Sequence, residues 1–108
     1  MKKLLDEKKA LDIEIIDIGE DSIISDYFVI CTGTSNTHIK AIADGLLIDG
    51  KQEGLIKNHV EGYNQAKWLL VDYGDIVVHI FAKEEREYYD IESLWQKTAS
   101  ILEQPKEQ

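Results

Sequence analysis

The segment 25–47 constrains the fold of this chain most, because it runs from a buried strand directly into an amphipathic helix. Residues 27–32 are apolar or small on both alternating faces, which is typical of a strand covered on both sides of a sheet. Ser35 occupies the position of a helix N-cap, and apolar residues follow it at helical spacing. These residues are Ile39, Ile42, Ala43, Leu46 and Leu47. The segment predicts an α/β fold, and it raises the question of whether the start of the helix binds a phosphate.

Hydrophobic periodicity predicts further elements on both sides of this segment. They are a helix at 2–11, a strand at 12–18, a turn at 19–25, strands at 55–61, 68–71 and 76–81, and a final helix at about 85–102. The strand at 55–61 alternates apolar and polar residues, so we expect it at an edge of the sheet. The order indicates an α/β sandwich in which helices flank a mixed sheet of about five strands. We expect residues 1–108 to form one domain with a frayed tail at 103–108.

Two details of this pattern give sharper predictions. Gly74 lies in the sequence Asp72-Tyr73-Gly74-Asp75, where a glycine at positive φ would close a hairpin between the last two strands. In the final helix, adjacent positions point about 100° apart. We therefore expect Tyr88 to face the core and Tyr89 to face the flank or solvent. The other expected core-facing residues are Ile91, Leu94, Trp95, Thr98, Ile101 and Leu102.

The chain is acidic, with 21 Asp and Glu residues against 12 Lys and Arg residues and a net charge of −9. It contains no basic stripe of the kind that binds nucleic-acid phosphates, so we expect little direct nucleic-acid binding. An acidic surface favours a basic protein partner instead, although the same charge can serve solubility alone.

The single cysteine and the absence of long apolar runs indicate a cellular setting. Cys31 lies within an apolar strand, so no internal disulfide can form and a reducing environment is expected. No apolar run approaches the ~20 residues of a membrane span, and the apolar start of the chain is too short for a signal peptide. We expect a cytoplasmic protein that does not bind membranes.

Three histidines raise the possibility of a metal site. His38, His59 and His79 are 21 and 20 residues apart, which matches no local metal-ligand spacing. His79 lies between apolar residues of a strand, so we expect it to be partly buried and hydrogen-bonded. We predict no metal site.

Small and acidic residues at two turns could carry chemistry. Residues 33–35 could cradle a phosphate, but they lack the further glycines of a dinucleotide loop and the Gly-Lys-Ser/Thr of a Walker loop. Asp72 and Asp75 could hold Mg²⁺ or act as acid and base. Asp and Gly are also the usual residues of such turns. The structural interpretation is favoured in both places.

Aromatic residues give the strongest signal for binding. Trp68 opens a strand, and Tyr89 lies near Arg86 on the last helix. Partly exposed Trp and Tyr beside carboxylates and an arginine are typical of protein-contact surfaces. The same residues could equally form a sheet rim covered by its own helix, and the residues alone leave both interpretations open.

Three blocks of sequence add a resemblance to a known family. They are SDYFVICTGTSNTHIKAIAD at 25–44, KWLLVDYGDIVVHIF at 67–81 and REYYDIESLW at 86–95. Over about 12–95 the chain resembles the bacterial ribosomal silencing factors, which are related to plant iojap proteins. The resemblance implies a non-enzymatic translational repressor, without a cofactor, that acts in nutrient-limited cells. It would bind the large ribosomal subunit through large-subunit ribosomal protein fourteen, with at most marginal rRNA contact, and block joining of the small subunit.

The family fold is similar to that of nucleotidyltransferases, which use an Asp-x-Asp pair for Mg²⁺. In this chain Asp72 and Asp75 are three residues apart across a turn, so that pair is missing. The resemblance therefore implies the scaffold without its catalytic acids. The alternative is a nucleotidyltransferase-like, nucleotide-binding enzyme that uses Thr34, Ser35, Asp72 and Asp75.

The resemblance also implies where the partner binds. The matching positions are Trp68, Leu69, Leu70 and Asp72, with Arg86 and Tyr89 on the same face. No catalytic residue is implied. A homodimer is a further possibility, because an exposed edge strand at 55–61 could pair with a second copy.

Overall fold

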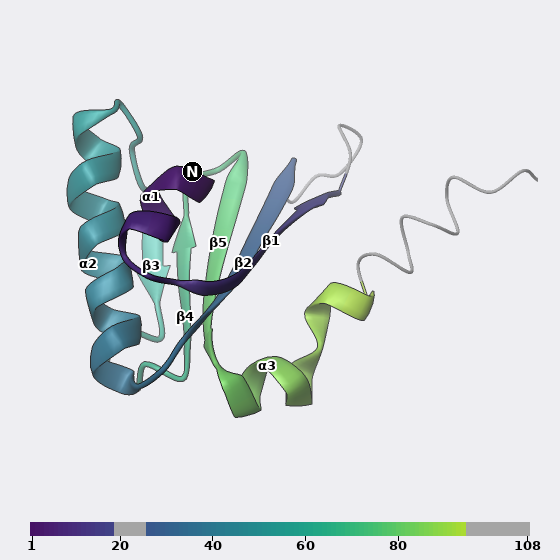
Figure 1. Cartoon of the computed structure of the whole chain (residues 1–108). Coiled ribbons are helices and arrows are strands. Elements are labelled where there is room, and N and C mark those ends of the chain that lie inside the picture. Colours follow the sequence, from purple (N-terminus) through teal and green to yellow (C-terminus); the bar gives the residue numbers. More distant parts are fainter. Residues whose placement is uncertain (19–25, 95–108) are drawn as a thin grey trace, which may run out of the picture.

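The computed structural model of this chain, which describes residues 1–18 and 26–94, has helices on both faces of a five-stranded sheet (Figure 1). Its elements are α1 (Lys2–Glu7), β1 (Leu11–Asp17), β2 (Tyr27–Gly33), α2 (Asn36–Gln52), β3 (His59–Glu61), β4 (Trp68–Asp72), β5 (Ile76–Ala82) and α3 (Lys83–Tyr89). The predicted mixed sheet flanked by helices is confirmed. The turn predicted at 19–25, the predicted core positions at 95–102 and the tail at 103–108 lie outside the described residues.

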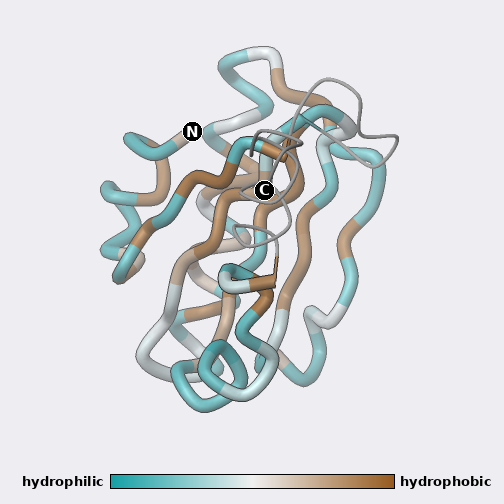
Figure 2. Tube along the Cα trace, turned by 90° about the vertical axis from the view of Figure 1, so that its right-hand side faces the viewer, coloured by the Kyte–Doolittle hydropathy of each residue, from teal (hydrophilic) through white to brown (hydrophobic). Residues whose placement is uncertain are grey.

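The sheet has the strand order β1-β2-β5-β4-β3. Its centre is the parallel pair β2 and β5, and all other pairs are antiparallel. Both central strands are almost continuously buried, as expected where helices cover both faces. Figure 2 shows the hydrophobic segments following these strands.

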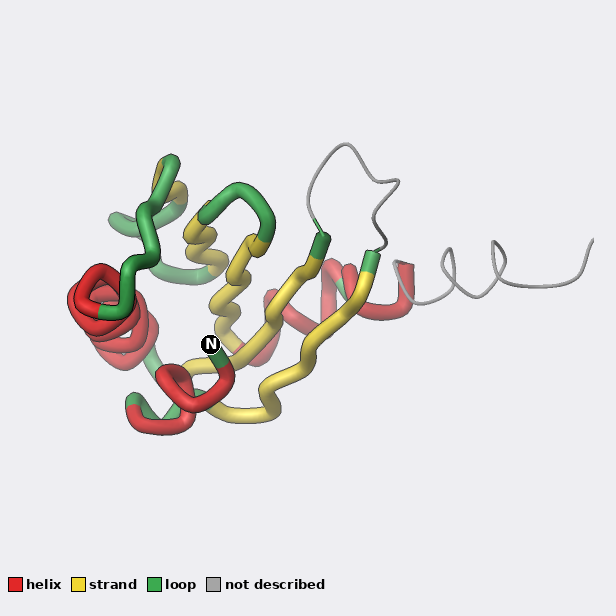
Figure 3. The backbone as a smooth tube through the Cα atoms, turned by 90° about the horizontal axis from the view of Figure 1, so that it is seen from above, coloured by secondary structure: helices red, strands yellow, loops and turns green. Residues whose placement is uncertain are grey.

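One face of the sheet is closed by α1 and α2, which lie together on one side of the strands in Figure 3. Ser35 caps α2 as predicted, because its Oγ accepts a hydrogen bond from the His38 N–H at 3.0 Å. The apolar stripe of α2 is buried against β2, β4 and β5, and both leucines of α1 are buried where α1 packs against α2 and β1. This layer holds the larger of the two clusters of core residues.

The sequence-based bounds are wrong for two elements. The expected strand at 55–61 is reduced to β3 at His59–Glu61, because the N–H of Leu55 bonds to the carbonyl of Gly50 and closes the end of α2 instead. The expected helix at 2–11 ends at Glu7, and β1 begins at Leu11. β3 lies at an edge of the sheet, which confirms the edge position predicted for the strand at 55–61.

The final helix is also shorter than predicted. It ends at Tyr89 because Asp90 adopts the left-handed conformation, with φ 45° and ψ 48°, and helical backbone resumes only at 91–94. The break changes which side chains face the sheet. Tyr88 is 81% exposed, so its predicted core position is wrong, and Leu94 is exposed as well. Tyr89 is the tyrosine that turns toward the sheet.

Candidate protein-interaction surface

The predicted partner residues of β4 lie on two opposite faces of the sheet, because side chains alternate along a strand. Leu69 is 0% exposed and belongs to the core beneath α2. Trp68 and Leu70 are half-buried on the other face, where α3 lies. Leu69 is therefore not available to a partner, whereas Trp68 and Leu70 are.

Trp68 is the centre of an aromatic cluster on this second face. It pairs across the hairpin with Phe81, and their rings stack with centroids 4.9 Å apart. The ring of Tyr89 lies 4.8 Å from that of Trp68, and Tyr89 remains 50% exposed. The fold thus brings together Trp68 and Tyr89, which were predicted as partner residues from separate blocks of sequence.

The indole of Trp68 also makes a polar contact beneath this surface. Its Nε1–H donates to Nδ1 of His79 at 3.0 Å. His79 is 4% exposed, and burial lowers its pKa to about 4. The prediction of a buried, hydrogen-bonded histidine is confirmed, and its partner is the predicted anchor residue itself.

The two aspartates that flank the β4–β5 turn both make hydrogen bonds within the fold. The carboxylate of Asp72 accepts from the Gly74 N–H at 2.7 Å and lies 3.5 Å from Nδ1 of His59. The backbone carbonyl of Asp75 accepts from the Tyr27 N–H at 3.0 Å. Gly74 has φ 90°, as predicted for the hairpin. Asp72 therefore supports the turn and adds negative charge beside Leu70.

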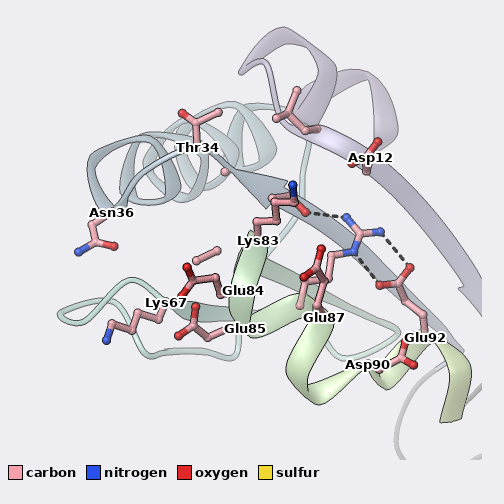
Figure 4. Close-up of a pocket in the computed structure, with 15 residues that line it drawn as sticks. Asp12, Thr34, Asn36, Lys67, Lys83, Glu84, Glu85, Glu87, Asp90 and Glu92 are labelled. Atoms are coloured by element: carbon pink, nitrogen blue, oxygen red, sulfur yellow. Dashed lines mark hydrogen bonds and ion pairs between the residues drawn. The ribbon is translucent and has the colours of Figure 1, made fainter.

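Arg86 is largely buried and holds α3 in place. Its Nε and Nη2 donate to the two carboxylate oxygens of Glu92 at 2.6 and 3.0 Å, and its Nη1 donates to Thr32 Oγ1 at 2.8 Å (Figure 4). The hydrogen bonds that Arg86 donates to the Glu92 carboxylate raise the pKa of Arg86 above its usual value. Only 12% of the side chain is exposed. This arrangement bridges the break at Asp90 and fixes the helix that carries Tyr89.

A further carboxylate at this face was not predicted from the sequence. Glu61 of β3 pairs with Leu70 of β4, so its side chain lies on the same face as Leu70. It is well exposed. We use the name Trp68 surface for Trp68, Leu70, Tyr89, Asp72 and Glu61 together. Apolar and aromatic groups lie at its centre and two carboxylates at its rim.

Two of the backbone N–H groups around the start of α2 are already used within the loop. The Thr34 N–H already donates to His38 Nδ1 at 2.9 Å, and the His38 N–H donates to Ser35. A hollow of about 820 Å³ lies beside this loop (Figure 4), and its lining is acidic. The acids are Asp12, Glu84, Glu85, Glu87, Asp90 and Glu92, against the cations Lys67, Lys83 and Arg86. This charge would repel nucleotide phosphates.

The four residues of the enzyme alternative do not meet. Thr34 and Ser35 follow the carboxyl end of β2, whereas Asp72 and Asp75 lie at the other end of the sheet, where β5 begins. Seven strand residues separate these ends, which corresponds to about 20 Å. Among the described residues, no three His, Cys, Asp or Glu side chains are grouped to hold a metal ion.

Comparison with known proteins decides the family. A family model described as "Ribosomal silencing factor during starvation" matches residues 1–108. This chain belongs to the ribosomal silencing factor family. The ribosomal silencing factor of Bacillus subtilis is 43% identical over 90 residues, which are 83% of this chain and 76% of the relative. That of Haemophilus influenzae is 40% identical over 95 residues, covering 88% and 93%.

Relatives outside bacteria and a solved structure agree with this membership of the silencing factor family. An iojap-related mitochondrial protein of Arabidopsis thaliana is 35% identical over 105 residues, covering 93% of this chain and 56% of the relative. A crystal structure of a Chromobacterium violaceum protein has a TM-score of 0.84 and 35% identity, covering 88% and 79%. The predicted resemblance is confirmed. In the part of this silencing factor that the structure describes, no helix has the length and apolar character needed to cross a membrane.

Proposed function

We propose that this silencing factor represses translation by binding the large ribosomal subunit through large-subunit ribosomal protein fourteen, under nutrient limitation. Bound there, it prevents the small subunit from joining. The Trp68 surface is the observation that carries this proposal, because it is the exposed face on which half-buried aromatic groups and carboxylates lie together. Family membership supports a ribosomal target.

The chemistry of the Trp68 surface suits a basic ribosomal protein. A tryptophan and a tyrosine that are already packed make anchors with little entropy left to lose on binding. The carboxylates of Asp72 and Glu61 at the rim would meet lysines and arginines of the partner, in a chain of net charge −9. A contact of about 800 Å² per partner would be enough for a stable complex.

Blocking of subunit joining requires no chemical step, because a bound protein excludes the small subunit by its volume. We propose a non-enzymatic, cytoplasmic role without cofactor or metal, and with no more than marginal rRNA contact. The separation of Thr34 and Ser35 from Asp72 and Asp75 supports this choice over the enzyme alternative. We propose a homodimer only as a weak association through β3, since this edge strand has three residues that could pair with a second copy.

Sedimentation of purified subunits tests the proposal. The chain should co-sediment with large subunits, and added small subunits should then form fewer joined ribosomes as the chain concentration rises. Failure to co-sediment, or binding that leaves subunit joining unchanged, would contradict the proposal. ATP or CTP with Mg²⁺ should leave the Tm of the chain unchanged, because the enzyme alternative predicts stabilisation by its ligand.

A further inference from the structure

The hydrogen bond between Trp68 and His79 fixes the protonation state of the histidine. An indole Nε1–H can only donate, so the Nδ1 of His79 must carry the lone pair that accepts it. The proton of the neutral ring is then on Nε2. That atom is buried and has no hydrogen-bond partner in the part of the chain that the structure describes. The ring is held in a single tautomer by its contact with Trp68.

The surroundings of His79 keep this acceptor in place. The imidazole lies in the middle of β5, with the ring of Phe28 4.7 Å away and the ring of Phe81 stacked at 6.2 Å. Trp68 and His79 are diagonal neighbours across the β4–β5 hairpin, because Trp68 pairs with Phe81 and Leu70 pairs with His79. A buried ring packed against two phenylalanine rings thus presents Nδ1 to the indole N–H.

We propose that His79 is a positioning residue of the Trp68 surface and determines what kind of group the surface accepts. Because its Nδ1 accepts the hydrogen bond of the indole N–H, His79 fixes the ring of Trp68 against Phe81 and Tyr89. It also occupies the only polar atom of the indole, so the exposed remainder of the ring is carbon surface. This inference rests on the proposed function, because it concerns the same surface.

The partner group that fits this surface follows from its chemistry. It is an aliphatic stem or a cationic head of a lysine or arginine that lies against the indole, with the carboxylates of Asp72 and Glu61 nearby. A hydrogen-bond acceptor of the partner could not bind the indole N–H, because this group already donates to His79. Specificity at Trp68 therefore depends on shape and positive charge.

Two variants of nearly equal size separate the hydrogen bond from the packing. His79→Asn places a side-chain oxygen close to the position of Nδ1 and can still accept the indole N–H. His79→Leu fills a similar volume without an acceptor. Binding to large subunits, corrected for the folded fraction by circular dichroism, should fall about tenfold for His79→Leu and less than about threefold for His79→Asn.

A second background tests whether the effect passes through Trp68. Trp68→Phe keeps an aromatic ring but has no N–H, so adding His79→Leu to it should cause no further loss of binding. Equal losses for the Asn and Leu variants, or a full additional loss in the Trp68→Phe background, would overturn the positioning role.

A readout without ribosomes separates this inference from the proposed function. The NMR resonance of the Trp68 indole N–H, assigned with Trp68→Phe, should be slow to exchange with solvent in the wild type and in His79→Asn, and fast in His79→Leu. Fast exchange in the wild type would overturn the inference. Slow exchange in a chain that does not co-sediment with large subunits would overturn the proposed function alone.

Discussion

Within residues 1–18 and 26–94, the two faces of the sheet differ in how completely they are covered. The face beneath α2 is a closed core in which Leu69, Val71, Val78 and Ile80 are all fully buried. The face beneath α3 combines a smaller core with the half-buried and exposed groups of the Trp68 surface. One face is thus a closed core that supplies stability, and the other is the face that we propose for contact with a partner.

The lengths of the covering helices explain this difference. α2 has 17 residues and presents a continuous apolar stripe to the strands. α3 has seven residues, none of them buried, and lies at the end of β5 (Figure 1). A short helix covers little area, so Trp68 of β4 is only half-buried and remains within reach of another molecule.

Substitution of the two adjacent leucines of β4 should give the largest difference in stability. Leu69→Ala should lower the free energy of unfolding by about 3 kcal/mol, because it opens a cavity in the closed core. Leu70→Ala should cost about 1 kcal/mol of stability, because Leu70 is only half-buried, and it should weaken large-subunit binding. Urea denaturation and sedimentation measure the two effects. Equal stability losses for both variants would contradict the difference between the faces.

Loss of the ion pair between Arg86 and Glu92 should have the next largest effect. Arg86→Ala should lower the free energy of unfolding by about 2 kcal/mol, because it leaves the half-buried Glu92 carboxylate and the buried Thr32 hydroxyl without their donor. Arg86→Lys keeps the charge but not the two-pronged geometry, so it should recover only part of the loss. Full recovery by lysine, measured by thermal and urea unfolding, would show that charge alone matters.

The buried histidine makes stability depend on pH. The pKa of His79 is lowered from 6.5 to about 4, so between these values the unfolded chain binds a proton that the folded chain does not. Stability therefore falls as pH falls through this range. From pH 8 to pH 5.5 the wild type should lose on the order of 1 kcal/mol more than His79→Asn, as measured by urea unfolding at each pH. Parallel curves for the two proteins would contradict a buried neutral ring.

The rim charge of the Trp68 surface should have the smallest effect. Asp72→Asn keeps an acceptor for the Gly74 N–H but removes the negative charge. Affinity for large subunits should fall about two- to fivefold at low salt, with the difference shrinking as salt rises. Isothermal titration at two salt concentrations measures this. A loss of affinity that does not depend on salt would indicate a damaged turn instead of a lost charge.

The sequence predicted the elements that depend on local patterns. The strand-to-helix segment, the Ser35 cap and the Gly74 hairpin each follow from a spacing or a single residue type, and the structure confirms them. The hydrogen bond between Trp68 and His79 was not predicted, although the register of the hairpin brings the two residues close together. Counting outward from Gly74 places these two residues as diagonal neighbours.

The C-terminal part of the site could not be predicted by periodicity. The break at Asp90 is stabilised by contacts of Arg86 with Glu92 and with Thr32, which is 54 residues away in the sequence. Such tertiary contacts override the helical pattern, so the core position predicted for Tyr88 is wrong, whereas Tyr89 packs on Trp68 and remains 50% exposed. Leu69 was included with its neighbours in the partner surface because the resemblance does not distinguish the two faces of β4.

The affinity of two variants for purified large subunits tests the central claim most directly. Trp68→Ala removes the centre of the Trp68 surface, and Ile48→Ala removes an exposed apolar side chain from α2. Trp68→Ala should weaken binding by about 2 kcal/mol, or about 30-fold, while Ile48→Ala binds like the wild type. Wild-type affinity for a folded Trp68→Ala variant, or an equal loss for Ile48→Ala, would contradict the assignment of binding to the Trp68 surface.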